Sequence, residues 1–215
     1  MNDKYIDIQG VAQTFKTAKG LFPALRDIDL TVAGRSGAPD WRFEGRVHAP
    51  AFGGHVADSI AFTLHGGAHR LELEDGWFRL GAGTLRASMV VDRTVHAFPD
   101  SLSPTAVVRW LQDAGGWRGR ATADAVPLGR ITGIVPEAKG WDGELYGTLA
   151  LSGRPSAPVL EVQTQAERFG WREIRTEYVS VKAHYEDGRL EVQDARARMR
   201  DVESRANLSV PLRLA

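Results

Sequence analysis

An internal repeat constrains the fold of this chain more than any other feature. When Gly34 is placed on Gly153, an offset of 119 residues, the stretches 34–91 and 153–210 align without a gap. The alignment matches GRSGAP with GRPSAP, RLELED with RLEVQD and RASMVV with RANLSV. So many matches without a gap indicate a duplicated structural unit. We therefore predict two related β units, at 34–92 and 153–215, joined by a linker at 93–152.

The hydrophobic pattern of both units is that of β-strands with one apolar face. In GELYGTLALSG (143–153), leucines alternate with Glu144, Tyr146 and Thr148. Glu186-Asp187-Gly188 has the composition of a tight turn between two such strands. We predict a mainly β fold, a long antiparallel, curled meander that is apolar on one side and polar on the other.

The predicted apolar face supplies the candidate binding residues. They are Phe62, Leu71, Leu73, Leu145, Leu149, Leu151, Leu160, Val162, Val179, Val181, Leu190, Val192, Leu208 and Val210.

The linker is predicted to contain a short helical insert. Ser103 is a suitable helix cap, Pro104 suits the first turn, and Gly115 would end the helix. A second short helix is predicted around Leu128–Val135, ahead of the entry strand of the second unit.

Composition excludes several classes of function. The 215 residues are 43% hydrophobic and 25% charged, as in a globular protein, and the formal net charge of zero argues against a nucleic-acid partner. The absence of cysteine excludes disulfides and thiolate metal sites. The sequence has no secretory signal and no apolar run long enough to cross a bilayer, so it predicts a cytoplasmic chain if expressed as written.

The first 33 residues have a different character. They read as a β-hairpin, and IDIQGVAQTF–KTAKGLFPALRDIDLTVA resembles the opening of ATP-binding subunits of nitrate- and sulfonate-type ABC transporters. In that family Phe15 would stack on adenine. A phosphate loop should follow, but no GK[ST] motif occurs in the chain, so we expect no ATPase activity.

No other catalytic or metal-binding constellation stands out. LHGGAH, with His65 and His69, lacks an accompanying nucleophile motif or carboxylates at metal-site spacing, which favours a plain turn. The six tryptophans follow or flank glycines in several places, as expected of strand ends rather than of a carbohydrate-binding module. The sequence predicts a non-enzymatic protein without cofactor or metal.

From Gly34 onward the chain resembles the AsmA-like superfamily, and within it the TamB-type translocation and assembly module proteins. LALSGRPSAPVLEVQTQA, EDGRLEVQDARARM and GWDGELYG carry the resemblance. It implies a taco-shaped β-sheet of the periplasm and cell envelope that passes phospholipid acyl chains along an apolar groove. It also implies a link to outer-membrane protein assembly.

Three functions therefore remain open at this stage. The first is a segment of a bridge-type lipid transfer protein, and the second is a truncated, inactive ABC ATP-binding subunit. The third is a β-sandwich binding module, in which the apolar face would be an ordinary core. The two resemblances meet near Gly34, which suggests either a gene fusion or an error of sequence assembly.

Overall fold

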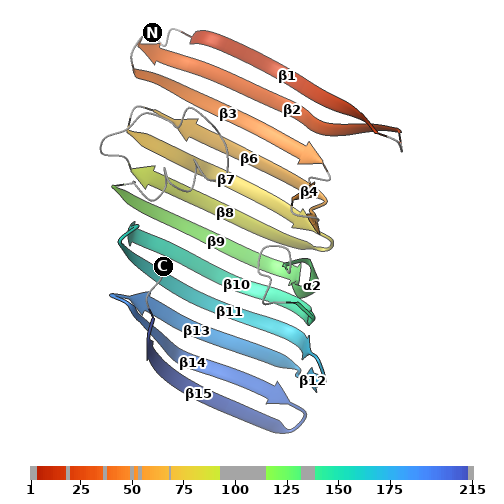
Figure 1. Ribbon diagram of the computed structural model, residues 1–215, viewed down its shortest axis with the longest axis vertical. Coiled ribbons are helices and arrows are strands. Elements are labelled where there is room, and N and C mark those ends of the chain that lie inside the picture. The colour runs from red at the N-terminus through yellow and green to blue at the C-terminus, as the bar shows by residue number, and fades with distance from the viewer. Residues whose placement is uncertain are drawn as a thin grey trace.

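The computed structural model describes residues 4–17, 20–35, 38–48, 51–52, 55–67, 69–92, 115–131 and 139–212. Nearly all of these residues belong to β-strands (Figure 1). The strands are β1 (Lys4–Thr17), β2 (Gly20–Arg35), β3 (Ala38–His48), β4 (Ala51–Phe52), β5 (His55–Val56), β6 (Ser59–Gly66), β7 (Arg70–Leu80), β8 (Gly83–Asp92), β9 (Gly116–Pro127), β10 (Trp141–Arg154), β11 (Ala157–Trp171), β12 (Ile174–Arg175), β13 (Tyr178–Glu186), β14 (Arg189–Met199) and β15 (Val202–Pro211).

One large antiparallel sheet contains all of these strands except β4 and β5, which pair with each other. Its order is β1-β2-β3-β6-β7-β8-β9-β10-β11-β13-β14-β15, with β12 added beside β11. Strands next to each other in the sequence are thus next to each other in the sheet, and Figure 1 shows them as a twisted ladder from β1 to β15. The predicted mainly β, curled meander is confirmed.

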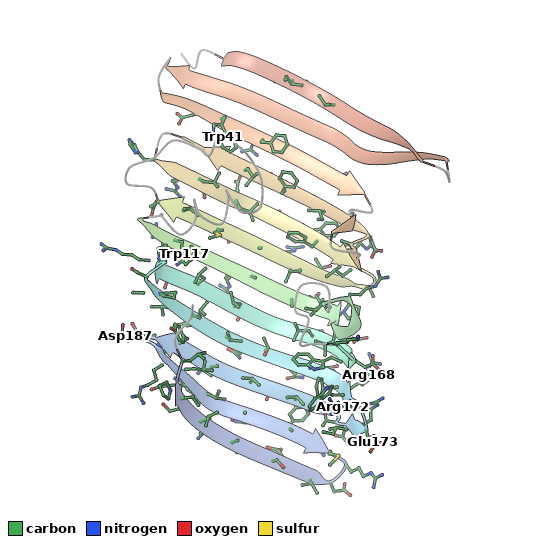
Figure 2. The ribbon with its side chains drawn as sticks, viewed as in Figure 1. Trp41, Trp117, Arg168, Arg172, Glu173 and Asp187 are labelled. Carbon is green, nitrogen blue, oxygen red and sulfur yellow. The ribbon has the colours of Figure 1, made fainter. Side chains whose placement is uncertain are left out.

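The turns follow from local sequence. Asp187 and Gly188 lie between the paired residues Glu186 and Arg189, and both have positive φ, at 50° and 72°. Such a turn twists in the same sense as its flanking strands, and Asp-Gly is a favoured sequence for it. The predicted turn at 186–188 is confirmed, and Figure 2 shows Asp187 at one end of the strands, with Arg168 and Arg172 at the other.

The backbone repeats at the offset seen in the sequence. Leu30 pairs with Phe43 and Val32 with Trp41; 119 residues later, Leu149 pairs with Val162 and Leu151 with Leu160. The β4–β5 hairpin likewise recurs in the pairing of Gly170 with Arg175. The repeat of the structure thus includes strands outside 34–92 and 153–215, and from here the two units are the two sets of six strands in the main sheet. The first unit is β1, β2, β3, β6, β7 and β8, and the second is β9, β10, β11, β13, β14 and β15.

Irregularities of pairing repeat as well. In β7 the register shifts between Leu73 and Gly76, and in β14 it shifts between Val192 and Ala195, again 119 residues later. An extra residue in one strand bends it and increases the local twist. The two units consequently bend at corresponding places.

Helical structure in the described residues is limited to α2 (Leu128–Ile131), which follows β9. It begins where the second short helix was predicted, and residues 132–138 lie outside the described residues. The predicted helix from Ser103 to Gly115 lies almost entirely outside them as well. Leu128 and Val126 are both buried, so α2 covers the adjoining ends of β9 and β10.

Apart from that corner, the described residues of the sheet form a single layer. The accessible surface is 14714 Å², whereas a compact monomer of 23.5 kDa exposes about 9,800 Å². Within the described residues no polar or charged side chain is buried, and the buried hydrophobic residues are Leu80, Val91, Val126, Leu128, Ala166, Ala183 and Tyr185. A conventional two-layer core is absent from this part of the chain.

Candidate apolar binding face

The two faces of the sheet differ in chemistry. Residues directly opposite each other in paired strands project from the same face, so the register identifies the members of each face. We call the side that includes Leu149 the apolar face and the side that includes Thr148 the polar face. All the candidate residues predicted from sequence lie on the apolar face.

One line of paired positions, which we call the long row, crosses all twelve successive strands of the sheet path. Every member is hydrophobic except Gly119, so apolar character continues from one edge strand to the other. The long row consists of Ile8, Leu30, Phe43, Leu64, Leu73, Met89, Gly119, Leu151, Leu160, Tyr185, Leu190 and Val210.

A second row lies beside it and has smaller side chains in its first half. It runs through Gly45, Phe62, Gly76, Ala87, Ala121, Leu149, Val162, Ala183, Val192 and Leu208. Strands lie about 4.8 Å apart, so eleven intervals from β1 to β15 give a face on the order of 50 Å long.

Side chains on this face shield one another only partly. The rings of Phe43 and Phe62, side by side on the apolar face, are inclined to each other with their centroids 5.4 Å apart. Leu149, in the middle of the sheet, is nevertheless 40% exposed, and Leu208 on the edge strand is 56% exposed. Because each CH₂ removed from water is worth about 0.8 kcal/mol, the face has a strong tendency to acquire an apolar covering.

The polar face is held by ion pairs across and along strands. His65 Nε2 lies 2.8 Å from Glu74 Oε2, and Arg42 lies 3.4 Å from the same carboxylate. The hydrogen bond from His65 is the largest cause of a lowered pKa for Glu74, with the charge of Arg42 acting in the same direction. These groups are well exposed, so water and salt screen the pairs and each contributes little to the stability of the fold.

A shallow depression of about 830 Å³ also lies on the polar face, in the second unit. Its lining includes Arg120, Lys182 and Arg196 together with Glu167 and Asp194, a mixture of both charges. The Tyr146 hydroxyl donates to Glu144 Oε2 at 3.1 Å, and partial removal of water together with this bond raises the pKa of Tyr146. The mixture of signs favours neither an anion nor a cation.

The histidines considered in the sequence do not form a metal site in the described residues. His65 is in β6 and His69 precedes β7, and Gly67 N–H donates to the Arg70 carbonyl across the connection. Gly67 and His69 therefore lie in the connection of the β6–β7 hairpin, in agreement with the predicted turn. The described residues contain no cluster of three or more metal-ligating side chains.

The candidate residues predicted from sequence cover more of the long row in the second unit than in the first. Phe43, Leu64 and Met89 belong to the long row but were not among the candidates. The repeat offset applied to Val162, Ala183 and Leu208 would have found them, because subtracting 119 gives positions 43, 64 and 89.

The N-terminal hairpin extends the same sheet. β2 continues through Ala33 and Gly34 without interruption, and it pairs with β3 from Arg26–Arg46 to Arg35–Ala38. Ile8 and Val11 on β1 are both large, exposed hydrophobic residues. β1 and β2 thus belong to the first unit.

Comparison with protein-family models, with curated proteins and with solved structures finds no match to this chain. Among the described residues, no helix has the length and apolar character needed to cross a membrane. The function is therefore inferred from the chemistry of the two faces.

Proposed function

We propose that the apolar face binds the acyl chains of lipids. The observation that carries this proposal is the long row, which crosses the sheet with hydrophobic residues at every position except Gly119 and belongs to a single layer of described residues. An acyl chain of roughly fifteen carbons gains on the order of 10 kcal/mol on complete transfer from water to an apolar surface. The face would act by burial alone, without a reacting group.

The shape of the face favours a flexible ligand over a compact one. Small-molecule sites are usually concave and surround their ligand with a few precisely placed polar groups. The apolar face instead offers a long surface with interchangeable Leu, Val and Ala side chains. Such a surface suits a linear hydrocarbon chain, which can shift along it without losing a specific contact.

The other two functions have less support. A β-sandwich would need a second sheet stacked on the apolar face, and beyond the main sheet the described residues form only the β4–β5 pair. An ATP-binding subunit would need a phosphate loop, which the sequence lacks. The resemblance to TamB-type proteins adds a role in the envelope and in outer-membrane assembly, and our proposal is restricted to acyl chains because they match the chemistry of the face.

Site-specific photo-crosslinking tests the proposal. Leu149→p-benzoyl-phenylalanine and Val162→p-benzoyl-phenylalanine place the probe on the apolar face. Thr148→p-benzoyl-phenylalanine and Gln163→p-benzoyl-phenylalanine, on adjacent residues, place it on the polar face. The full chain is produced in bacteria, irradiated, and analysed by intact-protein mass spectrometry.

Lipid adducts at positions 149 and 162, and few at 148 and 163, are expected. Equal labelling of both faces, or no lipid adduct on protein that circular dichroism shows to be folded β-sheet, would refute the proposal.

A further inference from the structure

The two outer strands of the sheet have free edges within the described residues. β1 pairs only with β2, and β15 pairs only with β14. Both strands also expose large hydrophobic residues on the apolar face: Ile8 (41%) and Val11 (42%) on β1, and Leu208 (56%) on β15. Unpaired strand edges are templates for pairing with another chain, and exposed apolar side chains strengthen that tendency.

The junction between the two units shows how the free edges of β15 and β1 can pair. The last strand of the first unit, β8, pairs antiparallel with the first strand of the second unit, β9. In this junction Ala87 lies opposite Ala121, and Met89 lies opposite Gly119. β15 corresponds to β8, because Ala206 and Leu208 are 119 residues after Ala87 and Met89.

β1 corresponds to β9 through the strands that they pair with. Ala121 on β9 pairs with Leu149, and Ile8 on β1 pairs with Leu30, the position 119 residues before Leu149. The next pairs agree, since Gly119 pairs with Leu151 and Ile6 pairs with Val32. The free edge of β1 is therefore the counterpart of the edge of β9 that β8 occupies.

We propose that β15 of one copy pairs antiparallel with β1 of a second copy, in the register of the β8–β9 junction. Ala206 then lies opposite Ile8, Leu208 opposite Ile6, and Ser204 opposite Val11. Hydrophobic residues then continue across the junction, because Leu208, the last member of the second row, meets Ile6, and Ile8, the first member of the long row, meets Ala206. On the polar face Asn207 lies opposite Asp7, with Arg205 one diagonal step away, so the charges at the junction are compatible.

This contact joins two different surfaces, so it does not close on itself in a dimer. Such head-to-tail contacts produce open chains of subunits unless a rotation closes them into a ring. The proposal thus predicts assemblies whose size grows with protein concentration. It is independent of lipid binding, because Leu149 and Val162 lie several strands from either edge.

Engineered cysteines test the register directly, because the chain has none of its own. Opposed residues of antiparallel strands have Cα atoms about 4.5–5.5 Å apart, within the range that a disulfide bridges. Ile8→Cys and Ala206→Cys are prepared as separate full-length proteins, mixed, and oxidised mildly. Ile8→Cys mixed with Asn207→Cys is the matched control, because Asn207 is adjacent to Ala206 but on the other face.

A disulfide-linked dimer is expected in the first mixture only, and the double variant Ile8→Cys/Ala206→Cys is expected to give a ladder of oligomers on a non-reducing gel. Leu208→Lys should lower the average mass measured by light scattering, because it places a charge at the junction. If each single cysteine variant on its own formed as much disulfide-linked dimer as the mixture, the contact would be symmetric and the proposal would be overturned. A constant monomer mass at all concentrations, without cross-linking, would also overturn it.

Discussion

The indole ring of Trp41 lies over Gly66, the residue directly opposite it on the neighbouring strand, and occupies the space that a Cβ atom on Gly66 would need. The second unit reverses this arrangement. Leu160 stands at the position of Trp41, and Tyr185 stands at the position of Gly66. The large side chain has therefore changed strands between the units while the cross-strand pair has kept its place (Figure 2 labels Trp41).

This relationship predicts a compensating pair of substitutions. Gly66→Ala should lower the free energy of unfolding by about 1–3 kcal/mol, because the added methyl group overlaps the indole ring. The double variant Trp41→Leu/Gly66→Tyr, which copies the second unit, should recover most of the loss. Urea denaturation measures both. Gly116→Ala is the control, since its added Cβ would meet the Gly153 carbonyl oxygen at an ordinary 3.5 Å; equal stability of the two alanine variants would contradict the prediction.

The hairpin turns predict a second difference between the units. Gly81 has φ 65°, and Arg200, 119 residues later, has φ 54° in the corresponding turn. Left-handed backbone is unfavourable for residues with a Cβ atom, whereas glycine adopts it readily. Arg200→Gly should therefore raise the free energy of unfolding by about 0.5 kcal/mol, and Gly81→Arg should lower it by about 1 kcal/mol. Denaturation midpoints that move in the same direction for both variants would be incompatible with this account.

The lowered pKa of Glu74 predicts a dependence of stability on pH. Its pKa lies below the ordinary 4.5, chiefly because of the hydrogen bond from His65. A carboxylate of this kind stabilises the folded state above pH 4.5, and the stabilisation is lost as the pH falls through the folded-state pKa. Glu74→Gln, which copies Gln193 of the second unit, should lower the denaturation midpoint near neutral pH, and the difference should vanish in acid. A difference that is constant from neutral to acidic pH would assign the effect to packing.

The proposed lipid function predicts a dependence on chain length rather than on head group. Each added CH₂ contributes about 0.8 kcal/mol, which is about fourfold in affinity. Saturated fatty acids of increasing length should displace a fluorescent fatty acid with Kd values that fall by about that factor per carbon. Leu149→Asp should weaken binding about tenfold, whereas Thr148→Asp, on the polar face, should leave it unchanged. An affinity that depended on the head group instead of the chain length would argue against binding to the apolar face.

The sequence predicted the meander well because alternation of apolar and polar residues is a local property. It identified one face of the second unit down to Leu145, Val179 and Val210, and the turn at Asp187. Alternation does not reveal what covers an apolar face, so a sandwich core and an open surface were equally compatible with it. The single layer became apparent only because thirteen of the fifteen described strands pair in one sheet.

The N-terminal strands illustrate a second limit of sequence reasoning. Identical residues at the repeat offset are concentrated in 34–39 and 65–91, whereas Leu30 and Leu149 are the only identical pair between 20–33 and 139–152. Strand pairing depends on backbone hydrogen bonds and on apolar character at alternate positions, and both survive extensive sequence change. β2 therefore repeats the register of β10 although the sequences of the two strands differ.

The repeated register makes the sheet divisible. Removal of residues 35–153 would join Gly34 to Arg154 within a strand, and positions 30, 32 and 34 would meet Val162, Leu160 and Pro158 in the register that they now have with Phe43, Trp41 and Pro39. The remaining six strands would keep one complete set of turns and bulges. A molecule built in this way can be shortened or lengthened by whole units, with every newly formed backbone pairing copied from one already present.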